Sequence, residues 1–431
     1  MNNNDQKIQT QSGAGFTLAS LTIGHFLQHY LVTAILGLLP TVVASMGLGV
    51  AYFSLLHTIR YLSGGLVTCL TGFIVDKSGN QWGLILTGCM ILGAILFAVL
   101  AITPSAGFLI IIAILVSIPG QVWHIPAIAA ISQRFEKNRG FGLSIHGVGA
   151  QVGALTGPIA TGGIILGVSL WASIGPSGIV GKIIDFLISM EPWRSVSVIY
   201  IIPTLLTAVL VWWSLKNLKS VIANDPNDEG IKSHLNNAKS LLSNPVILSL
   251  VIIVFLRNTA FNSLTEWVPF YLTTPSSEGG LGATVMAQGI GLGIVTSLGF
   301  FMAPVLGVLS DKFGRKAILV PSMALIAVLT LAIVFVGEIF VILTILGIIG
   351  LFSYTLGQIL QALVLDQVDS GIAGTTLGLV LGINQLLGSV SPLIALWVSQ
   401  TWGLVAVFSY TSILWALPCL ILIVTPVKKA N

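Results

Sequence analysis

Long apolar runs without a charged side chain limit this chain to one kind of fold. Four of them contain no Asp, Glu, Lys or Arg: residues 85–102, 108–118, 195–213 and 318–336. About 20 such residues, wound as a helix, cross a bilayer of roughly 30 Å. The runs are apolar on every face, whereas the strands of a membrane β-barrel alternate apolar and polar residues. We therefore predict an all-α integral membrane protein.

The apolar segments divide into twelve predicted membrane-spanning helices, several of them joined by short gaps that suit helical hairpins. The predicted spans are residues 17–44, 51–75, 83–102, 106–132, 140–171, 194–214, 245–272, 284–310, 317–336, 338–365, 372–399 and 403–425. The polar stretch that separates the sixth and seventh spans indicates a linker between two six-helix halves. The predicted organisation is a tail at 1–16, a first half at 17–214, a linker at 215–244, a second half at 245–426 and a tail at 427–431.

The basic residues predict which way the chain crosses the membrane. Fourteen of the eighteen Lys and Arg residues fall in the tails and in the loops of one face, which the positive-inside rule makes cytoplasmic. Both termini are then cytoplasmic, and the protein is expected to be a multi-pass protein of the plasma membrane, the inner membrane in a bacterium. Residues 1–15 lack the apolar core of a removable signal peptide. The three cysteines lie in predicted spans without C-x-x-C spacing, so we expect no disulfide framework.

A short charged motif occurs twice, once in each half. Residues 72–83 read GFIVDKSGNQWG and residues 307–316 read GVLSDKFGRK, so the two copies follow the second and eighth spans. One motif at the same place in two six-helix halves indicates an internal repeat. Parallel repeats of this kind predict a substrate path between the halves, near the middle of the membrane.

The motif G-x-x-x-D-K-x-G resembles the loop signature of the major facilitator superfamily. The resemblance implies the major facilitator fold, alternating access and a cytoplasmic latch that stabilises one access state. The residues of the latch would be Gly72, Asp76, Lys77, Gly79, Gly307, Asp311, Lys312, Gly314 and Arg315. The first copy has Asn80-Gln81 where the second has Arg315-Lys316, so the first latch is expected to be electrostatically weaker.

Parts of the first half also resemble the fosmidomycin-resistance group of that superfamily, which is typified by proton-linked efflux of an anionic phosphonate antibiotic. The segments that carry this resemblance are GHFLQHY (24–30), WHIPAIAAIS (123–132) and RGFGLSIHGVGAQVGALTGP (139–158). His29 stands where an acidic residue is expected, and an extra Ile separates His124 from the following Pro. The residues Gly153, Gly157 and Pro158 resemble an antiporter glycine motif with one extra residue before Gly162, and predict close helix packing and a bend.

Five histidines lie in the predicted spans of the first half, and all of them except His146 belong to the first group of candidate site residues. His25 and His29 are four residues apart and share a helix face, with Gln28 close to it. These residues could converge with Gln121 and His124, because the first and fourth helices commonly line the cavity in this superfamily. His57 and Arg60, three residues apart, form a second pair.

Three interpretations of these histidines stay open: structural hydrogen bonding between helices, proton coupling or substrate contact, and ligation of a metal or haem. The pKa of an unperturbed histidine, about 6.5, makes it a natural proton carrier near neutral pH. A His-x-x-x-His pair can bind a metal, but no Cys or acidic residue joins it nearby in sequence. We therefore assign no residue as a metal ligand and expect no cofactor.

The second half contributes polar residues on three predicted helices. Arg257 lies beside a stripe of Asn258, Asn262 and Glu266, whose spacing of four places them on one helix side, facing protein or water. The alternative for this segment is that Arg257 only neutralises Glu266. The remaining candidates are Tyr354, Gln358, Gln361 and Asn384.

These observations predict a secondary active transporter, a symporter or antiporter coupled to protons, for a small polar or anionic organic solute. Two intramembrane arginines favour an anion, because guanidinium pairs well with carboxylate or phosphonate. No nucleotide-binding G-x-x-x-x-G-K-[ST] sequence is present, and we expect neither an enzyme nor a partner of nucleic acid. The expected partners are the solute, protons and the lipid bilayer, with the protein acting as a monomer. The alternatives are a histidine-dependent transporter of a metal or metal chelate, and a histidine-ligated membrane redox or sensor protein.

Overall fold

The computed structural model is built of helices of membrane-spanning length. It describes residues 13–77, 81–135, 139–174, 178–216, 243–367 and 373–427, and every regular element in those ranges is helical. Eleven segments among them are long and apolar enough to cross a membrane. The helix α3 (Val50–Lys77), with 28 residues, adds a twelfth of sufficient length. The prediction of an all-α membrane protein is thus confirmed, and the predicted number of twelve spans is close to the eleven candidate spans among the described residues.

Contacts along the chain divide it into two compact units. The first unit comprises Met1–Gly49 with Leu70–Ala223, and the second comprises Val50–Cys69 with Asn224–Asn431. The helix α3 is therefore shared, because most of its length packs with the second unit. Phe53 at its start lies 5.9 and 5.1 Å, between ring centroids, from Trp267 and Phe270. The predicted boundary at the linker, most of which lies outside the described residues, remains a prediction.

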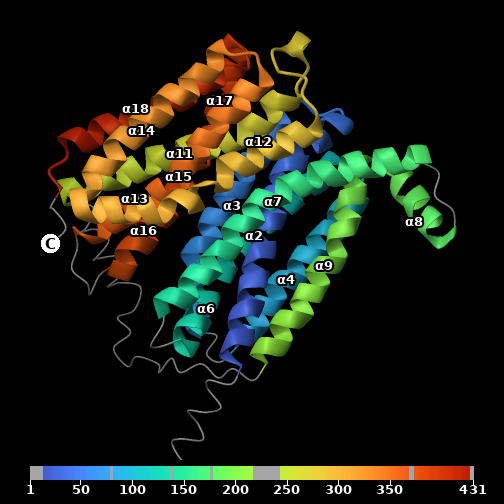
Figure 1. Ribbon diagram of the computed structural model, residues 1–431, viewed down its shortest axis with the longest axis horizontal. Helices are drawn as coiled ribbons and strands as arrows, with labels where there is room; N and C mark the ends of the chain where they lie inside the picture. The colour runs from blue at the N-terminus through green and yellow to red at the C-terminus, as the bar shows by residue number, and fades with distance from the viewer. Residues whose placement is uncertain are drawn as a thin grey trace, which may run out of the picture. The chain divides into compact units, whose positions relative to one another are not determined.

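Besides its part of α3, the first unit holds seven helices among the described residues (Figure 1). They are α2 (Ala14–Ser45), α4 (Trp82–Ile102), α5 (Ala106–Leu115), α6 (Ser117–Arg134), α7 (Arg139–Ile174), α8 (Gly178–Ile188) and α9 (Pro192–Leu215). The pair α4 and α9 and the pair α2 and α7 make the two most extensive helix contacts of this unit.

Glycines at every fourth position of α7 let it approach the backbone of α2. A Cβ placed on Gly149, Gly153 or Gly157 would lie 2.6, 2.0 or 2.3 Å from a backbone oxygen of α2. Only glycine, which has a hydrogen in place of a side chain, fits at such a distance. This row of glycines therefore sets the separation of the two helices. Two of the predicted motif glycines, Gly153 and Gly157, therefore face α2, and Pro158 follows them inside the same helix.

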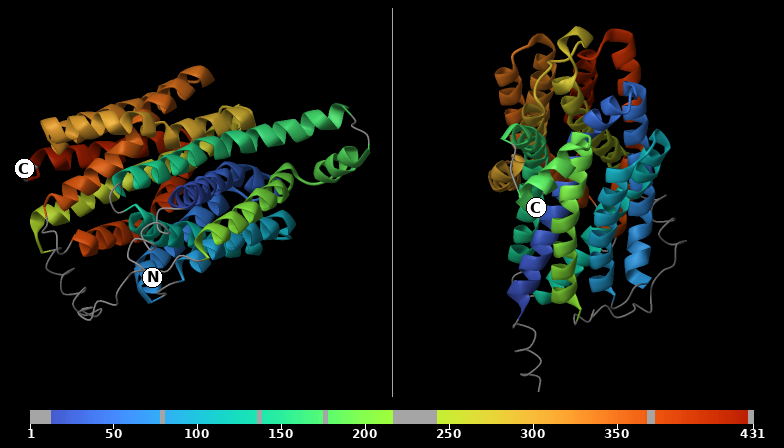
Figure 2. Two further views of the ribbon diagram at one scale, coloured as in Figure 1. Left: turned by 60° about the horizontal axis from the view of Figure 1, so that its bottom comes forward. Right: turned by 90° about the vertical axis from the view of Figure 1, so that its right-hand side faces the viewer.

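One helix of the first unit was not predicted from the sequence. The helix α8 lies beside the ends of α7 and α9 (Figure 2), between the fifth and sixth predicted spans. It has only 11 residues, too few to cross a membrane. Its side chains Ile179 and Phe186 are exposed. Gly178 precedes the rest of the helix in the left-handed region, at φ 75°, where glycine is favoured.

The second unit holds the first part of α3 and eight further α-helices with two short 3₁₀ turns among the described residues. They are α11 (Pro245–Thr273), η1 (Ser276–Glu278), α12 (Val285–Ser297), α13 (Gly299–Phe313), α14 (Arg315–Ala332), η2 (Ile333–Phe335), α15 (Ile339–Leu365), α16 (Ala373–Gly388), α17 (Ser391–Trp402) and α18 (Ala406–Val424). Buried hydroxyls tie α18 to its neighbours: Ser412 donates to the carbonyl of Ala327 at 2.7 Å, and Thr411 lies 2.8 Å from the Ser263 hydroxyl.

Three predicted spans are each divided into two helices. The pair α5 and α6 meets at Val116 and the pair α12 and α13 at Leu298, and both junction residues keep right-handed helical backbone angles. Each of these pairs therefore still crosses as one span, Ala106–Ser132 and Val285–Phe313. The third divided span, 372–399, is α16 and α17, with a crossing segment at Gly382–Trp402.

Candidate functional site

Four histidines of the first unit meet at one place; we call His25, His29, His124 and His146 the histidine group. They come from α2, α6 and α7, three helices that contact one another. The approach of α2 to α6 depends on Gly24, because a Cβ there would lie 2.4 Å from the ring of the fully buried Trp123. The contact between these two residues places their chain neighbours, His25 and His124, at the same level.

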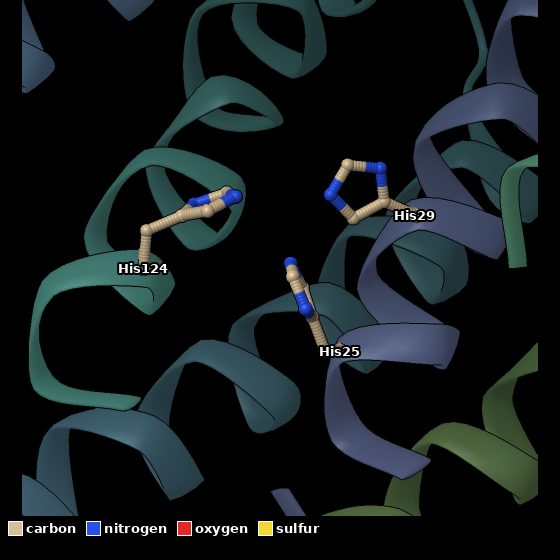
Figure 3. Close-up of side chains that lie close together, drawn as sticks. All are labelled: His25, His29 and His124. Carbon is tan, nitrogen blue, oxygen red and sulfur yellow. The ribbon is translucent and has the colours of Figure 1, made fainter. Parts of the chain in front are cut away.

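The rings of the histidine group are in mutual contact. The centroid of His25 lies 4.8 Å from that of His29 and 5.2 Å from that of His124, both edge to face. The third pair, His29 and His124, is 5.8 Å apart. His146 instead stacks on His25 at 4.0 Å with an interplanar angle of 18°. Figure 3 shows His25, His29 and His124 projecting toward a common space from two helices.

Hydrogen bonds to backbone fix the tautomers of two of these imidazoles. Nδ1 of His25 donates to the carbonyl of His146 at 3.0 Å, and Nδ1 of His124 donates to the carbonyl of Gly120 at 2.7 Å. A neutral imidazole that carries its proton on Nδ1 presents a bare lone pair on Nε2. The Nε2 of His25 is buried and makes no hydrogen bond with the described part of the protein. The ligand atoms of His25, His29 and His124 all lie within 4.8 Å of one another, so these three residues could hold a metal ion.

The second unit buries a different combination of side chains; we call His57, Arg60 and Glu266 the ion-paired group. Oε1 of Glu266 lies 3.4 Å from Nδ1 of His57 and 3.9 Å from Nη2 of Arg60. The side chains of His57 and Glu266 are 0% and 1% exposed. At these distances neither contact has hydrogen-bond geometry, and the contact with His57 is an ion pair when the imidazole is protonated. Arg60 also lies 4.4 Å from the ring centroid of Tyr61.

Arg257 lies apart from that group. Its Nη1 donates to Oδ1 of Asn258 at 2.9 Å, and its Nη2 donates to the backbone oxygen of Ser353. The rings of Phe261 and Trp415 lie 5.2 and 5.7 Å from its guanidinium carbon. Among the described residues, its polar contacts are therefore to neutral oxygens.

The hypothesis that Arg257 neutralises Glu266 is wrong, because the carboxylate pairs with His57 and Arg60. Nine residues separate the two side chains along α11. At about 100° per residue they point to opposite sides of the helix. Glu266 is also buried rather than solvated at a helix end.

The other predicted site residues lie in several environments. Gln28 and Asn384 are buried, Gln121 and Asn262 are half-buried, and neither amide atom of Asn384 hydrogen-bonds within the described residues. Its neighbour on α16 is bound to another helix, because Oε1 of Gln385 accepts from the hydroxyl of Thr68 at 3.2 Å.

On α15, three predicted residues lie in successive turns. The exposed Gln358 donates to the hydroxyl of Tyr354 at 3.0 Å, and Gln361, one turn on, is half-buried. The backbone of Tyr354 lies against a glycine, since a Cβ on Gly299 would be 2.6 Å from its Cβ. This contact brings α13 close to α15.

The second copy of the charged motif forms an ion network at the junction of α13 and α14. Arg315 pairs with Asp311 one turn earlier and with Asp366, whose Oδ2 lies 3.2 Å from its Nε. Gly314 stands between the helices at φ 93°, while Gly307 and Lys312 lie on α13. In the first copy Gly72, Asp76 and Lys77 end α3 and their side chains are outside the description, as is Gly79 entirely.

A chain of hydrogen-bonded hydroxyl groups in the first unit was not predicted from the sequence. The Tyr200 hydroxyl lies 2.7 Å from that of Thr161 and 3.2 Å from that of Tyr30, so the chain links α7, α9 and α2. The signal that could have revealed it is the single tyrosine, Tyr200, in the uncharged run 195–213, where a buried hydroxyl needs a partner.

Comparison with known proteins agrees with this architecture. The family model described as the Major Facilitator Superfamily matches residues 21–392. A bacterial homolog of the human lysosomal transporter Spinster superposes with a TM-score of 0.72 at 16% identity, covering 96% of this chain and 95% of that chain. The nucleoside transporter NupG superposes with a TM-score of 0.72 at 12% identity, covering 95% and 98%.

The two structural likenesses concern the fold alone, and no curated protein matches the sequence. The family match is of another kind, since it spans most of the chain and includes both copies of the charged motif. The chain therefore belongs to the major facilitator superfamily, a family of multi-pass membrane transporters.

Proposed function

We propose that this protein is a proton-coupled secondary transporter that moves a small polar or anionic organic solute by alternating access. Membership of the superfamily supports transport as the general activity. The observation that carries the choice of an anionic solute is the buried guanidinium of Arg257, whose hydrogen bonds within the described residues all go to neutral oxygens.

A buried arginine without an acidic partner is costly in a membrane. Insertion scales place the cost of a charged side chain at the helix centre at about 2.5–3.5 kcal/mol. Arg257 is 7% exposed, and the carbonyl and amide oxygens around it offset that cost only in part. An anion would supply the missing charge, and guanidinium can bind carboxylate or phosphonate through two parallel hydrogen bonds. The solute is therefore expected to present such a group to Arg257.

The ion-paired group supports coupling to protons. Glu266 is almost fully buried between a histidine and an arginine. Protonation of either the carboxylate or the imidazole changes the net charge of the group by one, in surroundings where charge is costly. Proton relays in membrane pumps and transporters are built from Asp, Glu and His side chains, so Glu266 and His57 are of the kind that carries protons.

The proposal also includes the membrane, the orientation and the oligomeric state in which the protein acts. The protein would act as a monomer in the plasma membrane, the inner membrane in a bacterium, with both termini in the cytoplasm. Members of this superfamily are carriers, and the proposal includes no catalysed reaction. The basic residues that the positive-inside rule assigns to the cytoplasm include Arg315 and Lys316 of the second charged motif.

A ligand screen by thermal shift tests the choice of solute. A ligand that binds the folded state raises its melting temperature, so purified protein is screened against mono- and dicarboxylates, phosphonates, and neutral sugars and nucleosides. We expect at least one small anion to raise the melting temperature of the wild type and not that of Arg257→Gln.

The matched control is Arg194→Gln. Arg194 binds the backbone oxygens of Ala101 and Thr103 at 2.8 and 2.7 Å in the first unit, so its loss should leave the ligand-induced shift unchanged. Stabilisation by neutral solutes alone, or an equal anion-induced shift in Arg257→Gln, would contradict the proposal.

A further inference from the structure

We propose that His25, His29 and His124 bind a divalent transition-metal ion, with its fourth coordination position open. This inference goes beyond the proposed transport function, because binding of a metal can be measured in purified protein without any flux. It rests on the distances between the three imidazoles, on the hydrogen bonds that orient them, and on the kind of donor atoms they offer.

The distances are close to those of a coordination site. The three ligand atoms lie within 4.8 Å of one another. Geometry then places one point within about 2.8 Å of all three, compared with about 2.0–2.1 Å for a zinc–nitrogen bond. Each imidazole therefore needs to move by less than about 1 Å to reach bonding distance from a single ion. His29 and His124 are half-buried, so they can move more readily than a packed core side chain.

Two of the three imidazoles are already oriented as metal ligands are. A histidine that binds a metal through one ring nitrogen usually donates its other N–H to a carbonyl, a carboxylate or water. His25 and His124 each donate Nδ1–H to a backbone carbonyl, at 3.0 and 2.7 Å. Both therefore offer Nε2, and the Nε2 of His25 is buried without a hydrogen-bond partner in the described residues. A purely structural histidine would be expected to use that atom.

The donor atoms define the class of metal. Three neutral imidazole nitrogens suit Zn²⁺, Co²⁺, Ni²⁺ or Cu²⁺, whereas Mg²⁺ and Ca²⁺ prefer oxygen. Three histidines with an open fourth position are also a known zinc arrangement. The cluster includes no carboxylate from the described part of the chain, so the ion would keep its positive charge. An anion in the fourth position, hydroxide or an organic acid, would offset that charge in the membrane interior.

Cobalt(II) is the probe for this site, because its visible absorption is stronger in four-coordinate than in six-coordinate surroundings. Protein in detergent, with its affinity tag removed and stripped with a chelator, is titrated with Co²⁺. We expect saturation at one Co²⁺ per chain with a four-coordinate spectrum, and displacement by Zn²⁺. His29→Asn and His124→Gln should each weaken binding by at least about tenfold.

Two further variants separate loss of a ligand from loss of fold. His57→Gln changes a buried histidine of the second unit and should bind Co²⁺ as the wild type does. His29→Cys should still bind and gain a thiolate-to-cobalt band in the near ultraviolet, a signal that misfolding cannot produce.

Three results would overturn the proposal. They are an absence of saturable Co²⁺ binding in the wild type, binding that persists unchanged in both His29→Asn and His124→Gln, and a His29→Cys variant that binds without the thiolate band. None of them depends on the anion screen, so this site and the proposed transport function can fail independently.

Discussion

The histidine group of the first unit and the ion-paired group of the second unit are both buried among membrane-spanning helices, but different interactions stabilise them. In the histidine group, His25 and His124 are held by backbone carbonyls, and their ring contacts join neutral groups. In the ion-paired group, Glu266 is held by the side chains of His57 and Arg60. The first arrangement leaves nitrogen lone pairs available, and the second leaves a net charge that one proton can change.

The difference teaches how one membrane protein can bury polar residues for two purposes. Side chains anchored to backbone keep their orientation when a neighbouring side chain changes, which suits a ligand site. Side chains anchored to one another change together, which suits a switch. The two groups should therefore respond differently to the same kinds of substitution.

The largest loss of unfolding free energy is expected from Gly153→Ala. A Cβ at this position would lie 2.0 Å from the backbone oxygen of Phe26, which cannot move aside as a flexible side chain could. The helices α2 and α7 must then separate, and we expect a loss of about 3 kcal/mol, the upper end for overpacking. The backbone carbonyl of His146 on α7 orients the proposed ligand His25, so Co²⁺ binding should weaken too. Chemical unfolding in detergent and Co²⁺ titration measure the two effects.

Gly163→Ala is the matched control in the same helix. A Cβ at Gly163 meets no atom within 4 Å, so this variant should unfold as the wild type does or be up to about 1 kcal/mol more stable. Equal losses in the two variants would show that helix composition, rather than the contact with α2, sets the stability.

A double-mutant cycle compares the two groups directly. In metal-free protein, the cycle of His57→Gln and Glu266→Gln should give a coupling energy of about 1–2 kcal/mol, as expected for interacting side chains. The cycle of His25→Gln and His124→Gln should give a smaller coupling energy, because their rings are in contact but each residue's hydrogen bond goes to backbone. Unfolding free energies of the four variants, the two double variants and the wild type provide both values. Couplings of equal size would remove the distinction between the groups.

The smallest effect is expected at the second charged motif. Arg315 pairs with Asp311, whose side chain is 67% exposed, and with Asp366, whose side chain is 22% exposed. Exposed ion pairs contribute little, so Arg315→Gln should cost less than about 1 kcal/mol of unfolding free energy. The loss should shrink further in high salt, since salt screens exposed charges more than buried ones. A loss as large as the coupling energy expected for His57 and Glu266, about 1–2 kcal/mol, would place this network among the main determinants of stability.

Much of the fold could be predicted because only uncharged segments cross the interior of a bilayer readily. Uncharged runs of sufficient length must be helical in a bilayer, and the two motif copies mark equivalent places in the halves. The helix α8 could not be found in this way, because its short apolar face resembles part of a span. The sharing of α3 between units depends on contacts such as those of Phe53 with Trp267, which no local pattern encodes.

The candidate site was predictable from the sequence only in part. Spacing places His25 and His29 on one face of α2, the resemblance to the superfamily predicts that His124 approaches them, and the structure brings the three together. The pairing of His57 with Glu266 joins residues more than two hundred positions apart. Proximity in sequence was misleading for Arg257 and Glu266, because nine residues is two and a half helical turns.

Transport by the Glu266→Gln variant tests the central claim most directly, namely that the ion-paired group couples protons to solute. The anion identified by thermal shift is loaded into proteoliposomes, and accumulation driven by a pH gradient is compared with exchange at equal pH. We predict that Glu266→Gln keeps exchange, which shows that it is folded and binds the solute, and loses accumulation driven by the gradient. Accumulation by Glu266→Gln at the wild-type rate and to the wild-type extent would contradict the account.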